Sequence, residues 1–303
     1  MCRIGFRSIF PSRARVFRAL CICAAGLAAP AARAAAAPLP VLRQLRVEVA
    51  LRDSSGQPVR RAMAVTVEHA PGATHPPFVL LLHGRPAGVS ARRRMGLVQF
   101  PAAQDWLAGL GYFVVVPTRV GYGITGGPDV EATGPCGDKD FARGMAAVVT
   151  QTRQLLHSLQ ARYPAVDWSR GLVLGDSTGG IAALAVAAAR LPGVRGVIDI
   201  SAGDGGDSVH HPYQPCGAWR MARTLGAYGR RARVPALWMY SRNDGFWGRV
   251  WPRRWFDAYV DAGGSARFVE LPADKNNGHF IFTRNLPDWQ PGFIAFAAGL
   301  GLP

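Results

Sequence analysis

Residues 175–179 read Gly-Asp-Ser-Thr-Gly, a Gly-x-Ser-x-Gly pattern with Ser177 at its centre. An aliphatic run precedes the pattern and an alanine-rich stretch follows, so it lies between an expected strand and an expected helix. A sharp strand-to-helix turn at a serine holds the hydroxyl clear of the sheet and requires small residues two positions away. Gly175 and Gly179 meet this requirement. Ser177 is therefore the candidate nucleophile of an acyl-transfer reaction.

A serine hydroxyl is a weak nucleophile that needs a base, and the base needs a group to orient it. Downstream of Ser177, the apolar run 235–240 leads directly to Asp244. The last apolar run, 266–271, gives way to a loop that contains His279. Ligands and reactive groups of parallel sheets gather at the carboxyl ends of the strands. We therefore expect these three residues to form a catalytic triad in the order nucleophile, acid, base.

Other residues of the same types compete for these roles. The rival acids lie at the end of the expected strand 194–200 or in the loop that follows that strand: Asp199, Asp204 and Asp207. The other histidines either precede Asp244 or belong to no motif: His69, His75, His157, His210 and His211. His83 stands at a strand end, where a structural hydrogen-bonding role is expected.

An acyl-transfer site also needs two N–H groups that face the developing oxyanion. The residue after the nucleophile supplies one of them, which is here Thr178. The second comes from the loop after the early strand 78–82, which reads His-Gly-Arg-Pro. Because Pro86 has no N–H, Arg85 is the candidate for the second donor.

Strands and helices that would position these residues alternate from residue 78 onward. Strands are expected at 41–52, 62–67, 78–82, 112–116, 172–174, 194–200, 235–240 and 266–271. Helices are expected at 102–110, 141–159, 178–190, 219–228, 251–261 and 287–300. This alternation predicts a parallel sheet with helices on both faces. The first two strands, joined by a turn at 54–58, predict an antiparallel hairpin.

Two glycine-containing loops, 121–137 and 201–217, are too long to be simple connections, and we expect them to flank the substrate pocket. The candidate substrate contacts lie in these loops and directly after the candidate acid: Tyr122, Glu131, Tyr213, Phe246 and Trp247. Packing in the core is the alternative role for these aromatic residues. No insert is long enough for a large helical lid, which favours an open cleft.

The first 34 residues have the layout of a secretory signal peptide, with scattered arginines, a short apolar run at 19–29 and Ala-Arg-Ala at 32–34. Cleavage after residue 34 or 36 is expected, followed by one domain at 41–303. The apolar run is too short for a bilayer span of ~20 residues, so a membrane anchor is the weaker alternative. No other segment is long and apolar enough to span a membrane. We expect the mature protein in the periplasm or outside the cell.

Removing this leader changes the charge and the cysteine count. Its six arginines account for the fall in formal net charge from +16 to +10. The remaining arginines are scattered and accompany no nucleic-acid-binding motif, so no nucleic-acid partner is expected. Three of the five cysteines lie in the leader, and only Cys136 and Cys216 remain. In an oxidising compartment these two are candidates for a disulfide.

Together these features resemble the α/β-hydrolases, of the dienelactone-hydrolase-like or prolyl-oligopeptidase-like kind. The resemblance rests on His83-Gly84, the pentapeptide 175–179, Asp244 after a strand, and Gly278-His279, in matching order over residues 60–300. It implies the α/β-hydrolase fold, with a mostly parallel sheet of about eight strands. True dienelactone hydrolases use a cysteine nucleophile, whereas residue 177 is serine, which argues against dienelactone as the substrate.

The resemblance implies a serine hydrolase that acts on a small-molecule ester through an acyl-enzyme, with neither metal nor organic cofactor. A serine peptidase of similar architecture is one alternative. A non-catalytic binding protein on a hydrolase scaffold is another, although all triad positions are filled. The pattern selects neither the acyl group nor an oligomeric state.

Overall fold

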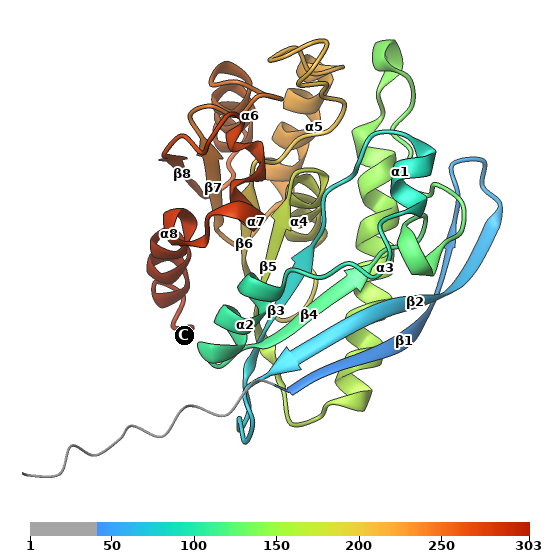
Figure 1. Cartoon of the computed structure of the whole chain (residues 1–303), viewed down its shortest axis with the longest axis vertical. Coiled ribbons are helices and arrows are strands. Elements are labelled where there is room, and N and C mark those ends of the chain that lie inside the picture. Colours follow the sequence, from blue (N-terminus) through green and yellow to red (C-terminus); the bar gives the residue numbers. More distant parts are fainter. Residues whose placement is uncertain (1–40) are drawn as a thin grey trace, which may run out of the picture. The chain divides into compact units, whose positions relative to one another are not determined.

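A computed structural model describes residues 41–303, and the expected signal peptide at 1–34 lies outside the described residues. One sheet of eight strands has the order β1-β2-β4-β3-β5-β6-β7-β8 (Figure 1). The strands are β1 (Val41–Arg52), β2 (Pro58–His69), β3 (Pro77–Leu82), β4 (Phe113–Thr118), β5 (Asp167–Asp176), β6 (Val194–Ile200), β7 (Ala236–Ser241) and β8 (Ala266–Leu271). Strand β2 is antiparallel to both neighbours and all other pairs are parallel, which confirms the predicted sheet.

The N-terminal hairpin is longer than its sequence pattern indicated. Strand β2 begins at Pro58, which pairs with Arg52, and not at residue 62. A proline at the first position of a strand costs little ladder pairing, so it does not delay the start of the strand. The turn between β1 and β2 is held by the Asp53 carboxylate, which accepts from the N–H groups of Ser55 and Gln57 at 2.9 and 3.0 Å.

The helices are α1 (Val89–Arg93), α2 (Pro101–Gly109), α3 (Phe141–Arg162), α4 (Thr178–Ala189), α5 (Ala218–Arg231), α6 (Val250–Asp261), α7 (Ile281–Arg284) and α8 (Leu286–Ala298). Three 3₁₀ turns are η1 (Gly123–Thr125), η2 (Cys136–Asp138) and η3 (Gly278–Phe280). The sequence did not predict α1, α7 or these turns, because such short elements do not develop a helical repeat of apolar residues. Each helix between residues 41 and 303 is too short or too polar to cross a membrane.

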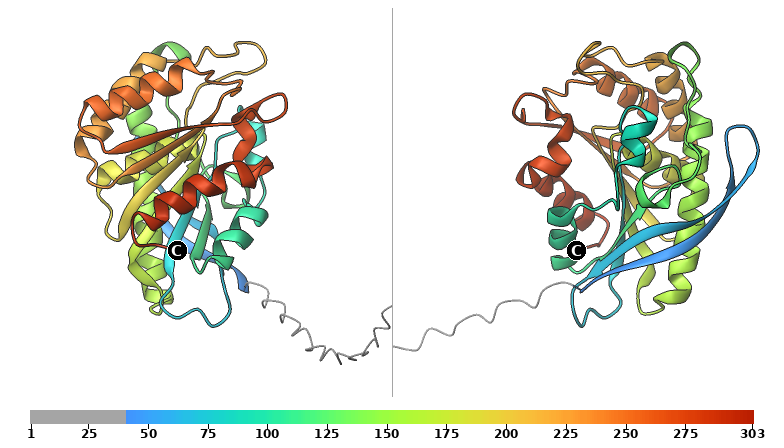
Figure 2. Two further views of the ribbon diagram at one scale, coloured as in Figure 1. Left: turned by 90° about the vertical axis from the view of Figure 1, so that its left-hand side faces the viewer. Right: turned by 45° about the vertical axis from the view of Figure 1, so that its right-hand side comes forward.

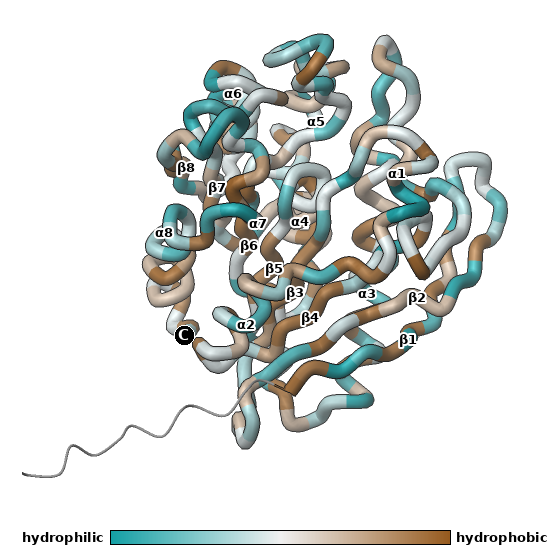
Figure 3. The backbone as a smooth tube through the Cα atoms, viewed as in Figure 1, coloured by the Kyte–Doolittle hydropathy of each residue, from teal (hydrophilic) through white to brown (hydrophobic). Residues whose placement is uncertain are grey.

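The sheet separates two apolar cores, as the alternation of side chains along its buried strands requires. Leu80 and Leu82 of β3 face the core shared with α3, α4, α5 and α6. Val79 and Leu81 point to the opposite face, where α2 and α8 pack. The two views in Figure 2 show these layers, and the continuous brown of the central strands in Figure 3 reflects burial on both faces.

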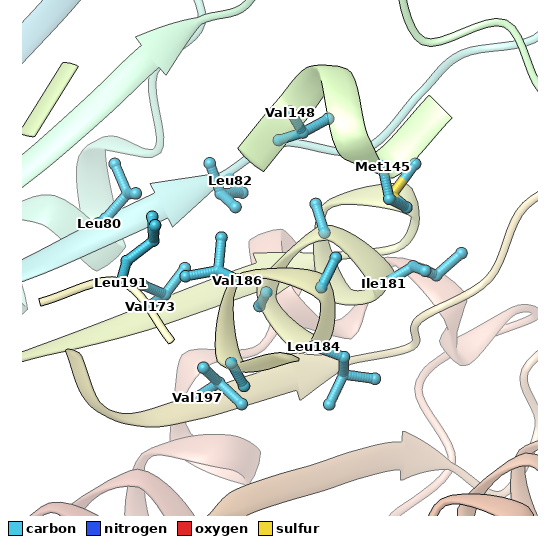
Figure 4. Close-up of a cluster of buried hydrophobic side chains, with 14 of the residues drawn as sticks. Leu80, Leu82, Met145, Val148, Val173, Ile181, Leu184, Val186, Leu191 and Val197 are labelled. Carbon is cyan, nitrogen blue, oxygen red and sulfur yellow. The ribbon is translucent and has the colours of Figure 1, made fainter. Parts of the chain in front are cut away.

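Helix α4 is the most deeply buried helix near the middle of the sheet. Every residue from Thr178 to Ala188 is buried, which explains why the helix is apolar all round. Figure 4 shows Ile181, Leu184 and Val186 of α4 among side chains of the neighbouring strands and of α3. This packing holds the N-terminus of α4, and with it Ser177, at the carboxyl end of β5.

Candidate active site

Ser177 occupies the turn between β5 and α4 with φ 55° and ψ −121°, a conformation that favours glycine. Its N–H donates to the Ile200 carbonyl at 3.0 Å, and its carbonyl accepts from the N–H groups of Gly180 and Gly203 at 2.9 and 3.3 Å. Strained backbone of this kind persists where the surroundings over-determine it. These three bonds therefore hold the serine in the expected elbow.

The side chains of Ser177, His279 and Asp244 lie in one hydrogen-bonded chain. Ser177 Oγ is 3.2 Å from His279 Nε2, and His279 Nδ1 is 3.0 Å from Asp244 Oδ2. The other carboxylate oxygen of Asp244 accepts from the N–H groups of Phe246 and Trp247 at 2.8 and 3.1 Å. Asp244 is wholly buried, so Oδ2 is left to His279 alone.

This chain sets the protonation of the imidazole. A carboxylate accepts from His279 Nδ1 only when that nitrogen carries the proton, which leaves Nε2 free to accept from Ser177. Burial by itself would lower the pKa of His279, but the facing Asp244 carboxylate and the charge of Asp176 raise it above the ordinary value. The arrangement therefore favours the imidazolium that forms when the serine loses its proton.

Asn277 joins the two loops that present the acid and the base. Its side-chain oxygen accepts from the N–H of Gly245 at 2.8 Å and from the N–H of His279 at 3.0 Å. The turn after β7 and the turn after β8 are thus fixed to each other. Sequence reasoning missed this residue, although it lies two positions before the candidate base.

Ser177 and His279 open onto a cavity of about 780 Å³. One wall is aromatic and contains Phe246, Trp247 and Phe280, and Phe100 also lines the cavity. The loop after β6 forms a wall of small residues that includes Gly203, Gly205 and Gly206. The charged side chains at the cavity are Arg85, Arg92, Lys139, Asp176 and Asp204.

Of the expected substrate contacts, Phe246 and Trp247 line this cavity. Trp247 is also a buried core residue. Its ring packs so closely on Gly203 that a Cβ atom placed there would lie 2.3 Å from it. Its indole N–H donates to the Ser201 carbonyl at 2.9 Å. Phe246 packs directly on the imidazole of His279, with ring centroids 4.2 Å apart.

The other three expected contacts, Tyr122, Glu131 and Tyr213, do not line this cavity. Tyr122 and Glu131 are buried, and the Tyr122 hydroxyl donates to Glu131 at 2.7 Å. The loop 121–137 folds inward because its polar groups bond one another and Arg119, so it leaves the cavity wall to neighbouring segments. Tyr213 is 56% exposed and lies on the surface against Gly248.

The rival acids are engaged elsewhere. Asp199 accepts from the Ala202 N–H at 3.0 Å and from the Tyr240 hydroxyl at 3.3 Å. Asp204 accepts from the Thr133 hydroxyl at 2.6 Å. Asp207 is exposed and contacts the rival histidine His210 at 2.9 Å. None of these three acids is recorded in a hydrogen bond to His279 among residues 41–303.

The two expected oxyanion donors lie beside Ser177. Thr178 is the first residue of α4, and the first N–H groups of a helix have no partner within it. Arg85 lies on the cavity wall next to Gly84, where an added Cβ atom would stand 3.1 Å from Ser177 Cβ. The loop after β3 is therefore in contact with the nucleophile.

Cys136 and Cys216 are bonded to each other in the structure, with Cα atoms 4.9 Å apart. The bond joins two segments that reach the cavity. The N–H of Cys216 donates to the Gly205 carbonyl at 2.9 Å, and Lys139 lies three residues after Cys136 with its ammonium 3.7 Å from Asp204. The disulfide thus supports the cavity wall from behind.

Several residues at the cavity escaped sequence reasoning. Arg92 is carried by the unpredicted helix α1, and Lys139 follows the loop that was expected to hold the contacts. Asp176 directly precedes the nucleophile, and its position inside the motif was an available signal. Burial, with Asp244 acting in the same direction and His279 opposing, raises the pKa of Asp176 to about 6.

Solved structures share this fold. A Pyrococcus horikoshii acylaminoacyl peptidase is 12% identical with a TM-score of 0.55, covering 87% of this chain. A Klebsiella pneumoniae protein assigned as a dienelactone hydrolase is 17% identical with a TM-score of 0.54, covering 86% of this chain and 99% of its own. An acetyl xylan esterase from Paenibacillus is 17% identical with a TM-score of 0.52, covering 86% of this chain and 88% of its own.

The chain spans 41% of the length of the acylaminoacyl peptidase that it matches. No protein-family model matches the sequence. No curated protein matches it either. With the sheet order and the helices on both faces, the structural likenesses show that the chain has the α/β-hydrolase fold.

Proposed function

We propose that this chain is an exported serine hydrolase that cleaves carboxylic esters through Ser177, His279 and Asp244. The observation that carries the proposal is the hydrogen-bond chain from Ser177 Oγ through His279 to the buried Asp244, at the mouth of a cavity of about 780 Å³. Ligand cavities in proteins range from about 300 to 1,000 Å³, so this one is large enough for a small-molecule ester.

In the proposed reaction, His279 Nε2 takes the Ser177 proton while Ser177 Oγ bonds to the ester carbonyl carbon. The carbonyl oxygen becomes an oxyanion held by the N–H groups of Thr178 and Arg85. The bond to the alcohol oxygen then breaks, and the alcohol leaves with the proton from His279. Water adds to the acyl-enzyme with the same help from His279, which releases the carboxylic acid and restores the serine.

The cavity favours an ester with a bulky apolar part. Phe246 packs on His279, and Phe280 extends this aromatic wall, with its ring centroid 5.4 Å from the imidazole and 6.0 Å from Phe246. An acetyl group alone would fill a small part of about 780 Å³. We therefore infer that the acyl or alcohol group contacts this wall.

Turnover of p-nitrophenyl acetate and butyrate by the mature protein tests the proposal. Ser177→Ala should abolish turnover above background, and a fluorophosphonate should label the wild type at Ser177 only. Ser169→Ala, an exposed serine on the same strand β5, serves as the matched control and should behave as the wild type. Equal rates for wild type and Ser177→Ala would refute the proposal.

A matched ester and amide with the same acyl group separate esterase from peptidase. The similarity to an acylaminoacyl peptidase keeps the peptidase as the second candidate. We expect the ester to be cleaved faster, in line with the similarity to an acetyl xylan esterase. A higher kcat/KM for the amide would favour the peptidase.

Export is proposed from the leader pattern and is supported by the bond between Cys136 and Cys216, since disulfides persist in oxidising compartments. The mass of the protein recovered from the periplasm or medium of a bacterial host would test it. Cleavage after residue 34 or 36 is expected. An uncleaved chain confined to the cytoplasm would contradict export.

A further inference from the structure

A buried polar network lies behind the loop that carries Arg85. Its centre is an ion pair in which Arg119 Nε is 2.7 Å from Glu131 Oε1 and Nη2 is 3.0 Å from Oε2. Arg119 is 1% exposed and Glu131 is 0% exposed. Removing two charges from water is costly, and such a pair is weak evidence for stability. A role beyond stability is therefore worth seeking in its other contacts.

Arg119 holds His83 at two points. Its Nη1 donates to the His83 carbonyl at 2.8 Å, and its backbone N–H donates to His83 Nε2 at 3.2 Å. Because Nε2 accepts, the ring proton is on Nδ1, which donates to the Gly84 carbonyl at 2.7 Å. Burial, and next the charge of Arg119, lower the pKa of His83 well below its usual value, so the ring stays neutral.

The Gly84 carbonyl belongs to the same peptide plane as the Arg85 N–H. A peptide is planar and its C=O and N–H point in opposite directions. The bond from His83 therefore fixes the direction of the proposed oxyanion donor. Gly84 also lies against Ser177, where an added Cβ atom would be 3.1 Å from Ser177 Cβ. The loop is therefore held between the nucleophile on one side and His83 with Arg119 on the other.

Tyr122 contacts both ends of the segment 83–85, which carries the proposed oxyanion donor. Its hydroxyl donates to Glu131 Oε2 at 2.7 Å and accepts from Arg85 Nη1 at 3.0 Å. Its ring also packs edge-on against the ring of His83, with centroids 4.7 Å apart. Asp129 holds the Arg85 guanidinium from the other side, with Nη1 at 2.9 Å from Oδ1.

We propose that Tyr122, with the Arg119–Glu131 pair, is a positioning residue that keeps the Arg85 N–H aimed at the substrate oxyanion. The inference rests on the proposed function of Ser177 and assigns the buried network a part in transition-state stabilisation. Oxyanion donors act because they are organised before the charge develops. A displacement of about 1 Å can cost up to about 10²-fold in rate.

The test is Tyr122→Phe, which keeps the ring on His83 and removes the hydroxyl that joins Glu131 to Arg85. We expect kcat to fall about tenfold with KM unchanged, since a single removed oxyanion donor costs about 10²–10³-fold and here the donor is loosened, not lost. The inhibition constant of a trifluoromethyl ketone that adds to Ser177 should rise by the same factor. Asp129→Asn should act in the same direction, because it loosens the Arg85 guanidinium.

Tyr112→Phe is the matched control. The hydroxyl of this buried tyrosine makes one hydrogen bond within residues 41–303, to the Pro303 carbonyl at 2.7 Å, and Tyr112 does not line the cavity. It should lower the melting temperature and leave kcat and the inhibition constant as in the wild type. Unchanged kinetics in Tyr122→Phe, or an equal fall in Tyr112→Phe, would overturn the positioning role while the hydrolase proposal stands. A wild type without Ser177-dependent turnover would overturn both.

Discussion

Gly179 lies against the Leu82 carbonyl oxygen, so close that a Cβ atom on residue 179 would be 2.0 Å away from it. A Cβ atom on Gly175 would likewise be 1.9 Å from the Gly179 carbonyl oxygen. Strand β3, the end of β5 and the first turn of α4 are therefore packed backbone against backbone. This close approach brings the loop after β3 into contact with Ser177.

Gly179→Ala should therefore destabilise the fold by about 3 kcal/mol or more, because the backbone of β3 must move to admit a methyl group. Urea unfolding of the purified variant measures the change. Gly109→Ala is the control, since Gly109 ends α2 with no heavy atom within 4 Å of an added Cβ atom. It should be neutral or stabilise by up to about 1 kcal/mol. Equal effects of the two substitutions would refute this account of the turn.

Asp244→Asn should lower kcat by about 10³–10⁴-fold with the fold intact, because an amide no longer favours the correct tautomer of His279 or its charged form. Steady-state kinetics on p-nitrophenyl butyrate, with circular dichroism for folding, would measure it. Asp207→Asn tests the exposed rival acid and should leave kcat within about twofold of the wild type. A larger loss in Asp207→Asn than in Asp244→Asn would assign the acid differently.

The acid limb of kcat/KM should have its midpoint above pH 6.5. His279 must be neutral to accept the Ser177 proton, so activity rises as pH passes through its pKa. Burial lowers the pKa of His279, but the negative charges of Asp244 and Asp176 raise it above the ordinary histidine value of about 6.5. Asp176→Asn removes one of these negative charges, so the limb should move to lower pH.

The control for this shift is Asp199→Asn. Burial raises the pKa of Asp199 well above its ordinary value, and Asp199 is not among the groups that shift the pKa of His279. Its acid limb should coincide with that of the wild type. If the limb of Asp176→Asn also coincides with the wild type, Asp176 has no electrostatic effect on His279.

Asp199→Asn should also stabilise the protein increasingly as pH rises above about 4. Because the pKa of Asp199 is raised in the folded state, the folded chain keeps a proton that the unfolded chain releases. Stability is therefore lost as pH rises from the unfolded value of about 3.9 towards the folded pKa, by at most about 1.4 kcal/mol per pH unit. Asparagine has no such proton. Urea unfolding at pH 5 and 8 should show a larger gain at pH 8, and an equal gain would contradict the buried neutral acid.

Loss of the disulfide should weaken both the fold and substrate binding. The bond closes a loop of 80 residues, which predicts a loss of about 4 kcal/mol in the Cys136→Ser, Cys216→Ser double variant. KM should rise, because the wall formed by Gly205 and Lys139 loses its support. Thermal unfolding and kinetics with and without a phosphine reductant measure both effects. Wild type after reduction should match the double variant, and an unchanged melting temperature would show that the bond adds no stability.

The sequence alone was enough to predict the succession of strands and helices along the chain and the turn that carries the nucleophile. The signals were local. They were the apolar runs of β3 to β8, the glycines on either side of Ser177 and the turn before Pro58. Each is readable from the sequence because the local backbone geometry restricts which residue types can occupy it. Asp244 and His279 could be selected because each lies in the loop that follows a predicted strand, and parallel strands bring their carboxyl ends to one edge.

Only the tertiary structure decided which polar side chains face the cavity. Tyr122 and Glu131 are of residue types that often line pockets. In the structure they are buried and hydrogen-bond to each other, to Arg119 and to Arg85. Lys139 reaches the cavity from just beyond the same loop. A loop residue has no periodic pattern to indicate its orientation. Burying a polar group costs free energy unless the group finds a hydrogen-bond partner. Those partners come from distant parts of the chain, so their pairing is a property of the folded protein.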